Sequence, residues 1–241
     1  MYRIIQGLFL IGMLVLFQSS DRLVKEAMAQ RIVVEDFEGY PAGVTPYEWK
    51  QPHKKSRSMR SFPREVDRDN DYFEVISEGG NKRVRFYTSN ESTQIVKLNG
   101  EGYTWNLRTH PRLAWDWKAT RLPEGAREDE KDLNDSGAAF YVTFNTDWLG
   151  RPRSIKYTYS STLPEGTVAE YGPLHVVVVS SARNGTGDWV HVERDVVADY
   201  YRFFRGDPPD EPISVTLWSD SDNTKKISEV YFDNITLLPA R

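Results

Sequence analysis

The 241-residue sequence contains no cysteine. Disulfides, thiolate metal ligands, a cysteine nucleophile and a lipidated amino-terminal cysteine are therefore excluded. The glycine motifs that bind phosphates and dinucleotides are also missing, as are the serine-hydrolase nucleophile elbow and the zinc motif HExxH. The 4 histidines show no zinc-ligand spacing. These absences argue against nucleotide chemistry, thiol chemistry and zinc-dependent hydrolysis.

Neither sign of charge dominates the chain, because 31 Lys and Arg oppose 35 Asp and Glu, for a formal net charge of −4. The one basic run, HKKSRSMR at 53–60, is interpreted as a solvated loop, with an anion or polyanion site as the alternative. Since no basic stripe is present, nucleic acid is not expected as a partner.

A long apolar run occurs only at the amino terminus, from Ile4 to Phe17, after Arg3. A transmembrane helix needs about 20 apolar residues, whereas a secretory signal needs a shorter run. The small residues Ala27 and Ala29, on either side of Met28, predict cleavage before Gln30. Residues 1–29 are thus predicted to be a signal peptide, and the protein to be periplasmic or secreted with no transmembrane helix after cleavage. An uncleaved membrane anchor is the alternative.

Helical patterns are scarce, and the best candidate is 196–205, just before a proline-rich loop. Elsewhere short runs alternate between apolar and polar residues, as strands do. The pattern predicts one domain over 30–241: an all-β, two-sheet antiparallel β-sandwich of jelly-roll type with little helix. The predicted strands are 31–40, 71–80, 81–89, 112–120, 137–147, 153–161, 174–182, 187–196, 213–218 and 230–235.

Six segments of the carboxy-terminal two-thirds occur in an ordered combination: 113–125, 134–144, 155–161, 175–181, 189–204 and 219–237. In this combination the chain resembles a bacterial family, domain of unknown function 3047. That resemblance implies no activity.

The two ends of the domain, VEDFEGY at 34–40 and YFDNITL at 231–237, are similar to the ends of galactose-binding-like and carbohydrate-binding jelly rolls. This second resemblance implies that the end strands are neighbours and that an acidic residue from each can ligate a structural calcium. Glu38 and Asp233 are the predicted metal ligands, with Glu35 or Asp36 as substitutes for Glu38. The alternative for Asp233 is a salt bridge or an outward-facing position.

The segment WSDSDNTKK, from Trp218 to Lys226, places Asp220, Asp222 and Asn223 between two predicted strands. Their oxygens suit calcium or the hydroxyls of a sugar. No glutamate follows at the distance that an EF-hand loop requires. The alternative is an ordinary polar turn, because Asp and Asn bond to their own backbone in turns.

Aromatic residues are plentiful, with 7 Trp, 13 Tyr and 11 Phe. Trp115 shares a strand face with Trp117 and continues an apolar stripe, so it is either a core residue, the favoured interpretation, or a platform for a sugar ring. Trp148 and Trp105 fall in predicted loops and are candidates for exposed rings.

Two further charged residues are candidate ligand contacts. Arg194 either pairs with Asp199, the favoured interpretation, or holds the carboxylate of an acidic sugar. Asp135 closes an acidic stretch at 129–135 that is otherwise typical of a solvated loop.

The sequence predicts an exported, non-catalytic protein that binds a glycan or another small polar ligand through Trp115, Trp148, Asp135, Arg194, Asp220, Asp222 and Asn223. One alternative is a glycoside hydrolase or lyase that uses Asp135 and Asp220 as paired carboxylates. The other is a structural partner in an envelope complex.

Overall fold

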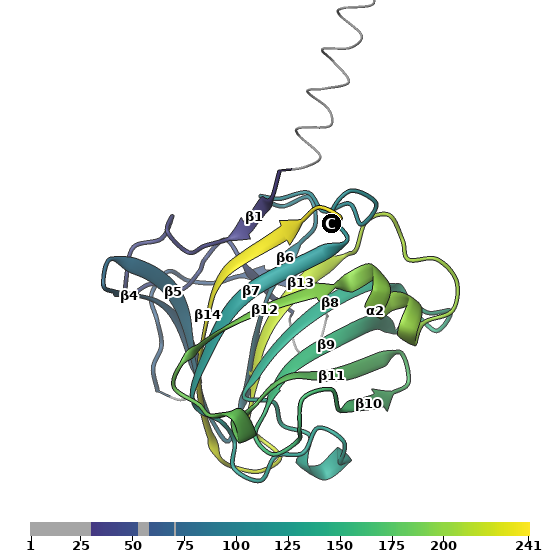
Figure 1. The fold of residues 1–241 in the computed structure, drawn as a ribbon. Helices are drawn as coiled ribbons and strands as arrows, with labels where there is room; N and C mark the ends of the chain where they lie inside the picture. Colours follow the sequence, from purple (N-terminus) through teal and green to yellow (C-terminus); the bar gives the residue numbers. More distant parts are fainter. Residues whose placement is uncertain (1–29, 53–57, 70) are drawn as a thin grey trace, which may run out of the picture.

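The computed structural model describes residues 30–52, 58–69 and 71–241. The predicted signal peptide and most of the basic run at 53–60 lie outside these residues. Within them, two β-sheets pack face to face in a sandwich of jelly-roll type (Figure 1). The short alternating runs form strands because one face of each is buried and the other is polar.

Sheet A has six strands in the order β12-β7-β14-β5-β4, with β1 added beside β14. Its members are β1 (Ile32–Glu35), β4 (Tyr72–Glu78), β5 (Asn81–Ser89), β7 (Arg112–Arg121), β12 (Trp189–Asp195) and β14 (Ile227–Leu238).

Sheet B has eight strands in the order β10-β11-β9-β8-β13-β6-β2-β3. Its members are β2 (Lys50–Pro52), β3 (Met59–Ser61), β6 (Ser92–Leu98), β8 (Ala138–Thr146), β9 (Pro152–Ser160), β10 (Val168–Tyr171), β11 (Leu174–Ser181) and β13 (Ser214–Asp220).

The first and last strands are neighbours, as the jelly-roll prediction requires. β1 runs antiparallel to β14, with Val33 opposite Thr236, and lies beside the carboxy-terminal end of β14 at the top of Figure 1. One pair departs from the antiparallel prediction, because β11 runs parallel to β9. The sandwich is therefore confirmed, with sheet B mixed at the edge that carries β10 and β11.

The core lies between the two sheets and is rich in aromatic rings. Trp115 and Trp117 of β7 are fully buried. The Trp115 ring stacks on Phe140 of the opposite sheet at a centroid distance of 4.7 Å. This packing confirms the interpretation of the β7 tryptophans as core residues, and Trp115 has no exposed surface for a ligand.

Helix α2 (Val196–Phe203) follows β12, where the sequence predicts a short helix. Its amino end is capped by Asp195, whose carboxylate accepts a hydrogen bond from Ala198 N at 2.9 Å. Buried Asp199 accepts from Tyr157 Oη at 2.9 Å and from two nitrogens of Arg194 at 3.0 and 2.6 Å. Arg194 thus joins α2 to the core, as the favoured interpretation of a pair with Asp199 predicts, and its role as a ligand contact stays a prediction. No helix among the described residues is long and apolar enough to cross a membrane.

Candidate functional site

A depression of about 300 Å³ lies on the outer face of sheet B. It crosses five adjacent strands, β6, β13, β8, β9 and β11. Its walls combine two aromatic rings with hydroxyl and amide groups. The lining residues are Gln94, Tyr141, Thr143, Pro152, Ser154, Leu174, Thr216 and Trp218.

Strand alternation brings these side chains to one face. Phe140 and Leu217 point into the core, so their neighbours Tyr141 and Trp218 point outward. The rings of Tyr141 and Trp218 stack with centroids 5.4 Å apart and planes 28° from parallel. Trp218 Nε1 donates to Ser92 Oγ at 2.8 Å, which fixes the indole. Both rings are half-buried and face the depression.

Polar groups surround this aromatic pair. Thr143 Oγ1 and Ser154 Oγ lie 3.0 Å apart across β8 and β9. Gln94 stands opposite Trp218 on β6, and Thr216 opposite Tyr141 on β8. A flat apolar platform ringed by hydroxyls and an amide is suited to a sugar ring, which has an apolar face and polar edges.

A buried cation lies next to the depression. Lys156 pairs with Tyr141 in the sheet, is 6% exposed, and its Nζ lies 5.6 Å from the centroid of the Tyr141 ring. Burial lowers the pKa of Lys156, but Tyr141, Asp220 and Glu128 outweigh that effect and the pKa is raised. The lysine is therefore charged, and its charge is balanced within the protein.

Glu128 is the buried carboxylate on one side of this lysine, at 1% exposure. It accepts hydrogen bonds from Thr158 Oγ1 at 2.8 Å and from Ser160 Oγ at 2.6 Å. Burial raises its pKa, while these hydroxyls and Lys156 lower it in part.

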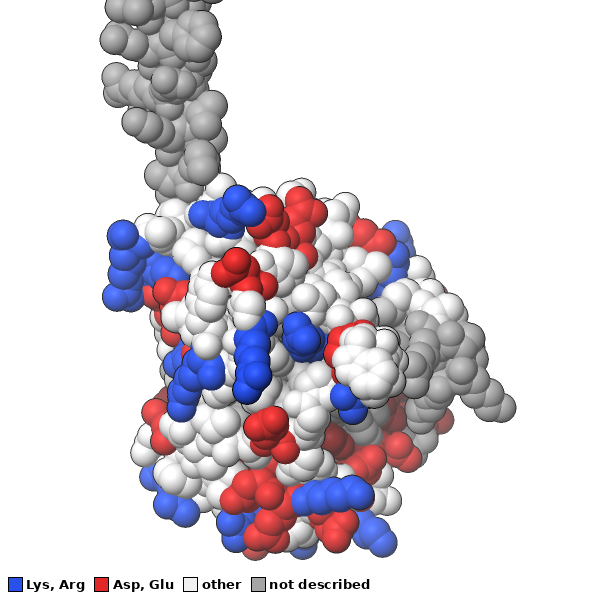
Figure 2. All heavy atoms as spheres, turned by 90° about the vertical axis from the view of Figure 1, so that its right-hand side faces the viewer, with Lys and Arg blue, Asp and Glu red and all other residues white. Residues whose placement is uncertain are grey.

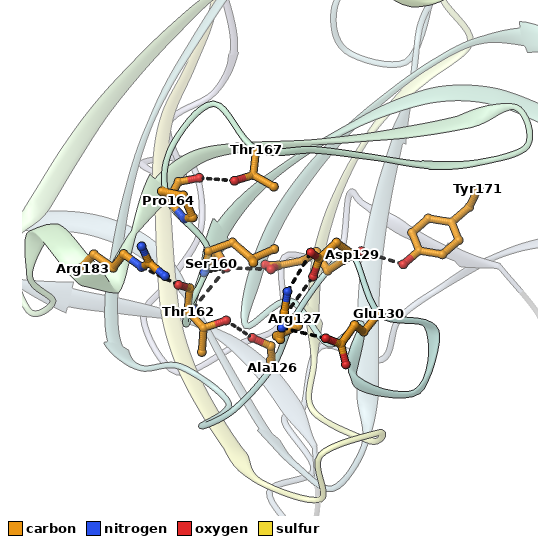
Figure 3. Close-up of polar contacts among 12 residues, drawn as sticks. Ala126, Arg127, Asp129, Glu130, Ser160, Thr162, Pro164, Thr167, Tyr171 and Arg183 are labelled. Atoms are coloured by element: carbon orange, nitrogen blue, oxygen red, sulfur yellow. Dashed lines mark hydrogen bonds and ion pairs between the residues drawn. The ribbon is translucent and has the colours of Figure 1, made fainter.

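The loop that carries Glu128 is held by a set of local contacts (Figure 3). Thr162 Oγ1 donates to Ala126 O at 2.6 Å, and Tyr171 Oη donates to Glu128 O at 2.7 Å. Arg127 bridges Asp129 and Glu130 at 3.0 and 2.7 Å. In Figure 2 acidic side chains gather at the lower end of the visible face, mixed with basic ones. The loop is thus ordered by hydrogen bonds and ion pairs around a buried glutamate.

Three aspartates form a second cluster where β13 ends. One carboxylate oxygen from each of Asp135, Asp220 and Asp222 lies within 4.8 Å of the others. Within the described ranges, they are the one group of three or more His, Cys, Asp and Glu side chains placed closely enough to share a metal ion. Two aspartates of the DSDN segment therefore come together with Asp135 and do not act as independent turn residues.

Asp135 is the fully buried member of the cluster. It accepts from Asn223 N at 3.0 Å, from Thr224 N at 2.7 Å and from Thr224 Oγ1 at 2.5 Å. Both its oxygens thus hold residues 223–224 against the segment that leads into β8. Because Asp135 has no exposed surface, its predictions as a glycan contact and as a catalytic acid are corrected to an anchoring role.

Asp220 differs from Asp135 because its Oδ1 is buried without a hydrogen-bond partner. Burial raises the pKa of Asp220 to about 7, against the opposing effect of Lys156, and Asp222 and Asp135 raise it further. The exposed Asn223 amide lies beside Asp222. With its nitrogen turned inward, this amide donates to Asp222 Oδ1 at 2.9 Å and to Asp135 Oδ1 at 3.2 Å. In that orientation hydrogen bonds hold the cluster together, whereas the opposite orientation would leave only oxygens facing one another, as around a cation.

Glu38 and Asp233, the predicted metal ligands at the chain ends, contact the first two residues of β5. Glu38 Oε1 accepts from Lys82 N at 2.7 Å, and Asp233 accepts from Asn81 Nδ2 at 2.7 Å. Burial raises the pKa of Asp233 to about 6. Both carboxylates therefore accept hydrogen bonds from the protein itself. A calcium ion at this position stays a prediction.

Glu35, an alternative ligand in that prediction, forms an ion pair with Lys97. Lys97 Nζ lies 2.8 Å from Glu35 Oε2 and donates to Val34 O at 3.0 Å. Both charged side chains are buried, so the pair neutralises itself between the sheets.

The two tryptophans that are predicted to lie in loops differ in their burial. Trp105 is buried and donates through Nε1 to His110 O at 2.8 Å. Trp148 is 89% exposed in the β8–β9 turn, as its predicted loop position requires. The predicted site residues do not include Trp218, Tyr141, Lys156 or Glu128. The alternation within β8 and β9 places Tyr141 and Lys156 outward, but only the pairing of these strands brings them together.

Comparison with known proteins agrees with the first resemblance. Residues 58–236 match the model of a family described as "Protein of unknown function (DUF3047)". The chain belongs to this family. No curated protein matches the chain.

Several solved structures resemble the fold. The family 30 carbohydrate-binding module of a Clostridium thermocellum cellulosomal cellulase has 13% identity and a TM-score of 0.45, with 87% of this chain and 98% of that one covered. The family 11 module from the same organism has 12% identity and a TM-score of 0.38 over 88% and 96%. The xyloglucanase domain of NopAA from Sinorhizobium fredii has 11% identity and a TM-score of 0.39 over 72% and 90%. None of these likenesses identifies a ligand for a DUF3047 chain.

Proposed function

We propose that this DUF3047 protein is an exported, non-catalytic protein that binds a neutral glycan on the outer face of sheet B. The observation that carries the proposal is the stacked pair of Trp218 and Tyr141, which opens into the depression. Stacking on this pair would desolvate the apolar face of a sugar ring. The surrounding hydroxyls and the Gln94 amide would replace the hydrogen bonds that its hydroxyl groups make with water.

The charges beside the depression favour an uncharged ligand. Lys156 is the buried cation there, it is not among the lining residues, and the nearby Glu128 and Asp220 carboxyl groups raise its pKa. An acidic sugar would need an unpaired cation, which the lining residues do not supply. The bound sugar is therefore expected to be neutral.

The lining also favours binding over hydrolysis. None of its eight residues carries a carboxylate, whereas most glycoside hydrolases place two carboxylates across the bond that they cleave. Asp135, one half of the predicted catalytic pair, is fully buried. The depression is thus built to hold a glycan without an acid–base pair around it.

A glycan array with the purified protein tests the proposal, run once with calcium and once with chelator. Trp218→Ala is expected to lose binding at least about 10-fold. Trp189→Ala is the matched control, because Trp189 is 38% exposed on sheet A and its loss should leave binding unchanged. Retained thermal unfolding of Trp218→Ala shows that the variant is folded. Absence of binding to every glycan would overturn the proposal.

Asp220 supports a second candidate, an enzyme that acts on a polysaccharide. It follows Trp218 on the same strand face, and its pKa of about 7 suits a general acid. Release of reducing ends or unsaturated products from a bound polysaccharide, abolished in Asp220→Asn, would support this candidate. Binding without product favours the first proposal.

A further inference from the structure

The turn between β8 and β9 displays an apolar tip to solvent. Trp148 is 89% exposed and Leu149 is 55% exposed. Tryptophan is on average a highly buried residue in folded proteins. Two adjacent large apolar side chains on one turn are therefore a candidate contact surface.

This turn is rigid although its tip is exposed. Asp147 Oδ1 accepts from Leu149 N at 2.9 Å and from Arg151 N at 2.8 Å, and Asp147 Oδ2 accepts from Arg151 Nε at 2.7 Å. Gly150 has a φ of 73° and donates its N–H to Asp147 O at 2.9 Å. A glycine suits that left-handed position. The backbone that carries Trp148 is thus ordered before any ligand arrives, which lowers the entropy cost of binding.

The turn continues the depression on sheet B. Pro152 lines the depression and stands opposite Thr146, at the start of the turn. Thr146 follows Tyr141 by five positions on β8, which is roughly 17 Å along the strand. Trp148, two residues beyond Thr146, is therefore carried by the turn at the Pro152 end of the depression, farther from Tyr141 than one sugar ring extends.

We infer that Trp148 is a second aromatic contact for the same ligand, so that the site takes a glycan chain of several sugar units and not a mono- or disaccharide. The inference rests on the function proposed above. The opposite charges of Asp147 and Arg151 are paired with each other. The turn therefore offers a neutral aromatic surface, which matches the neutral, stacking ligand expected at Trp218.

The test uses the polysaccharide that gives the strongest array signal, cut into defined fragments of two to eight sugar units. The affinity of the unmodified protein for a fragment is expected to rise with the number of sugar units until the fragment reaches Trp148, and then to level off. Trp148→Ala is expected to weaken the long fragments about 10-fold and to leave the shortest binding fragment unchanged. Asp147→Ala, which frees the turn, should weaken the long fragments in the same way but less.

Two controls separate this inference from the proposed function. Trp189→Ala should bind every fragment as the unmodified protein does, and Trp218→Ala should lose short and long fragments alike. If Trp148→Ala binds long fragments normally while Trp218→Ala does not, the inference is overturned and the proposed function stands. If no fragment or polysaccharide binds, both are overturned. A protein that binds through Trp148 while glycan affinity is unchanged would also overturn the inference.

Discussion

Both sheets carry aromatic side chains on their outer faces, but the two faces use them differently. On sheet A, Arg83 lies 4.9 Å from the Trp189 ring, Lys118 lies 4.8 Å from Tyr231, and Arg85 lies 5.6 Å from Tyr72. On sheet B, Trp218 and Tyr141 stack on each other beside a depression. Aromatic content alone therefore does not distinguish a binding face from a structural one.

The ion pairs explain the difference. On sheet A, Arg85 pairs with Glu229 at 2.7 Å and Arg83 pairs with Glu78 at 3.2 Å. These cations also contact the aromatic rings, so cation–π contacts and ion pairs close that surface. On sheet B the cation Lys156 is buried, and the lining of the depression is uncharged. Lys156 also lies 5.6 Å from the Tyr141 ring, but on sheet B the aromatic pair borders a depression that a ligand can enter.

The largest expected difference between the faces concerns glycan affinity. Tyr141→Ala removes half of the stacked pair and is expected to weaken binding at least about 10-fold. Tyr231→Ala on sheet A should leave affinity unchanged. Isothermal titration of both variants with one polysaccharide measures this contrast. Equal losses in the two variants would contradict the assignment of the site to sheet B.

The next effect concerns stability and pH. The folded pKa of Asp220, about 7, lies above its ordinary value of 3.8. The folded protein therefore holds a proton more tightly than the unfolded chain, and this stabilising contribution is lost as pH rises from about 4 to 7. Asp220→Asn is therefore expected to be more stabilising at pH 8 than at pH 4, in the presence of chelator. The change that it makes in the free energy of unfolding should be more favourable at pH 8 by about 1–3 kcal/mol.

Denaturant unfolding at several pH values measures this change. Glu229→Gln provides the control on sheet A, because Glu229 is paired with Arg85 and its loss should not stabilise the protein at pH 8. A pH-independent effect of Asp220→Asn would contradict the raised pKa.

Calcium tests the two predicted metal positions separately. At a calcium concentration ten times the dissociation constant, a bound ion would add about 1.4 kcal/mol to the free energy of unfolding. If the ion lies in the aspartate cluster, Asp222→Asn removes this gain and Asp233→Asn keeps it. The opposite pattern places the ion at the chain ends. No shift in thermal unfolding at millimolar calcium would contradict both positions.

The smallest effect is expected on sheet A. Lys118→Met removes the cation beside Trp189 and Tyr231, and should lower the free energy of unfolding by about 0.5–1 kcal/mol. Glycan affinity should stay unchanged, because this face is assigned a structural role. Reduced glycan binding in a fully folded Lys118→Met protein would extend the site to sheet A.

Much of the fold follows from local patterns in the sequence. The alternation in 112–120 and 137–147 predicts β7 and β8, and the proline-rich segment after 205 predicts that the short helix α2 ends before it. The similarity of the two chain ends to jelly-roll modules predicts that β1 lies beside β14. These features could be predicted because strand period, turn residues and helix stops act over a few neighbouring positions.

The site itself was decided by tertiary structure. Trp115 and Trp218 both lie in alternating strands, yet pairing and layer order bury the first and leave the second half-exposed beside Tyr141. Lys156 comes near Asp220 only because β9, β8 and β13 are adjacent in sheet B, and Glu128 is held at β9 by its hydrogen bonds from Thr158 and Ser160. Local patterns predict ten of the strands, the small helix and the acidic DSDN segment, but they miss β2, β3, β6 and β10. Which face stays open depends on register and burial between residues far apart in the chain, and local patterns do not encode those contacts.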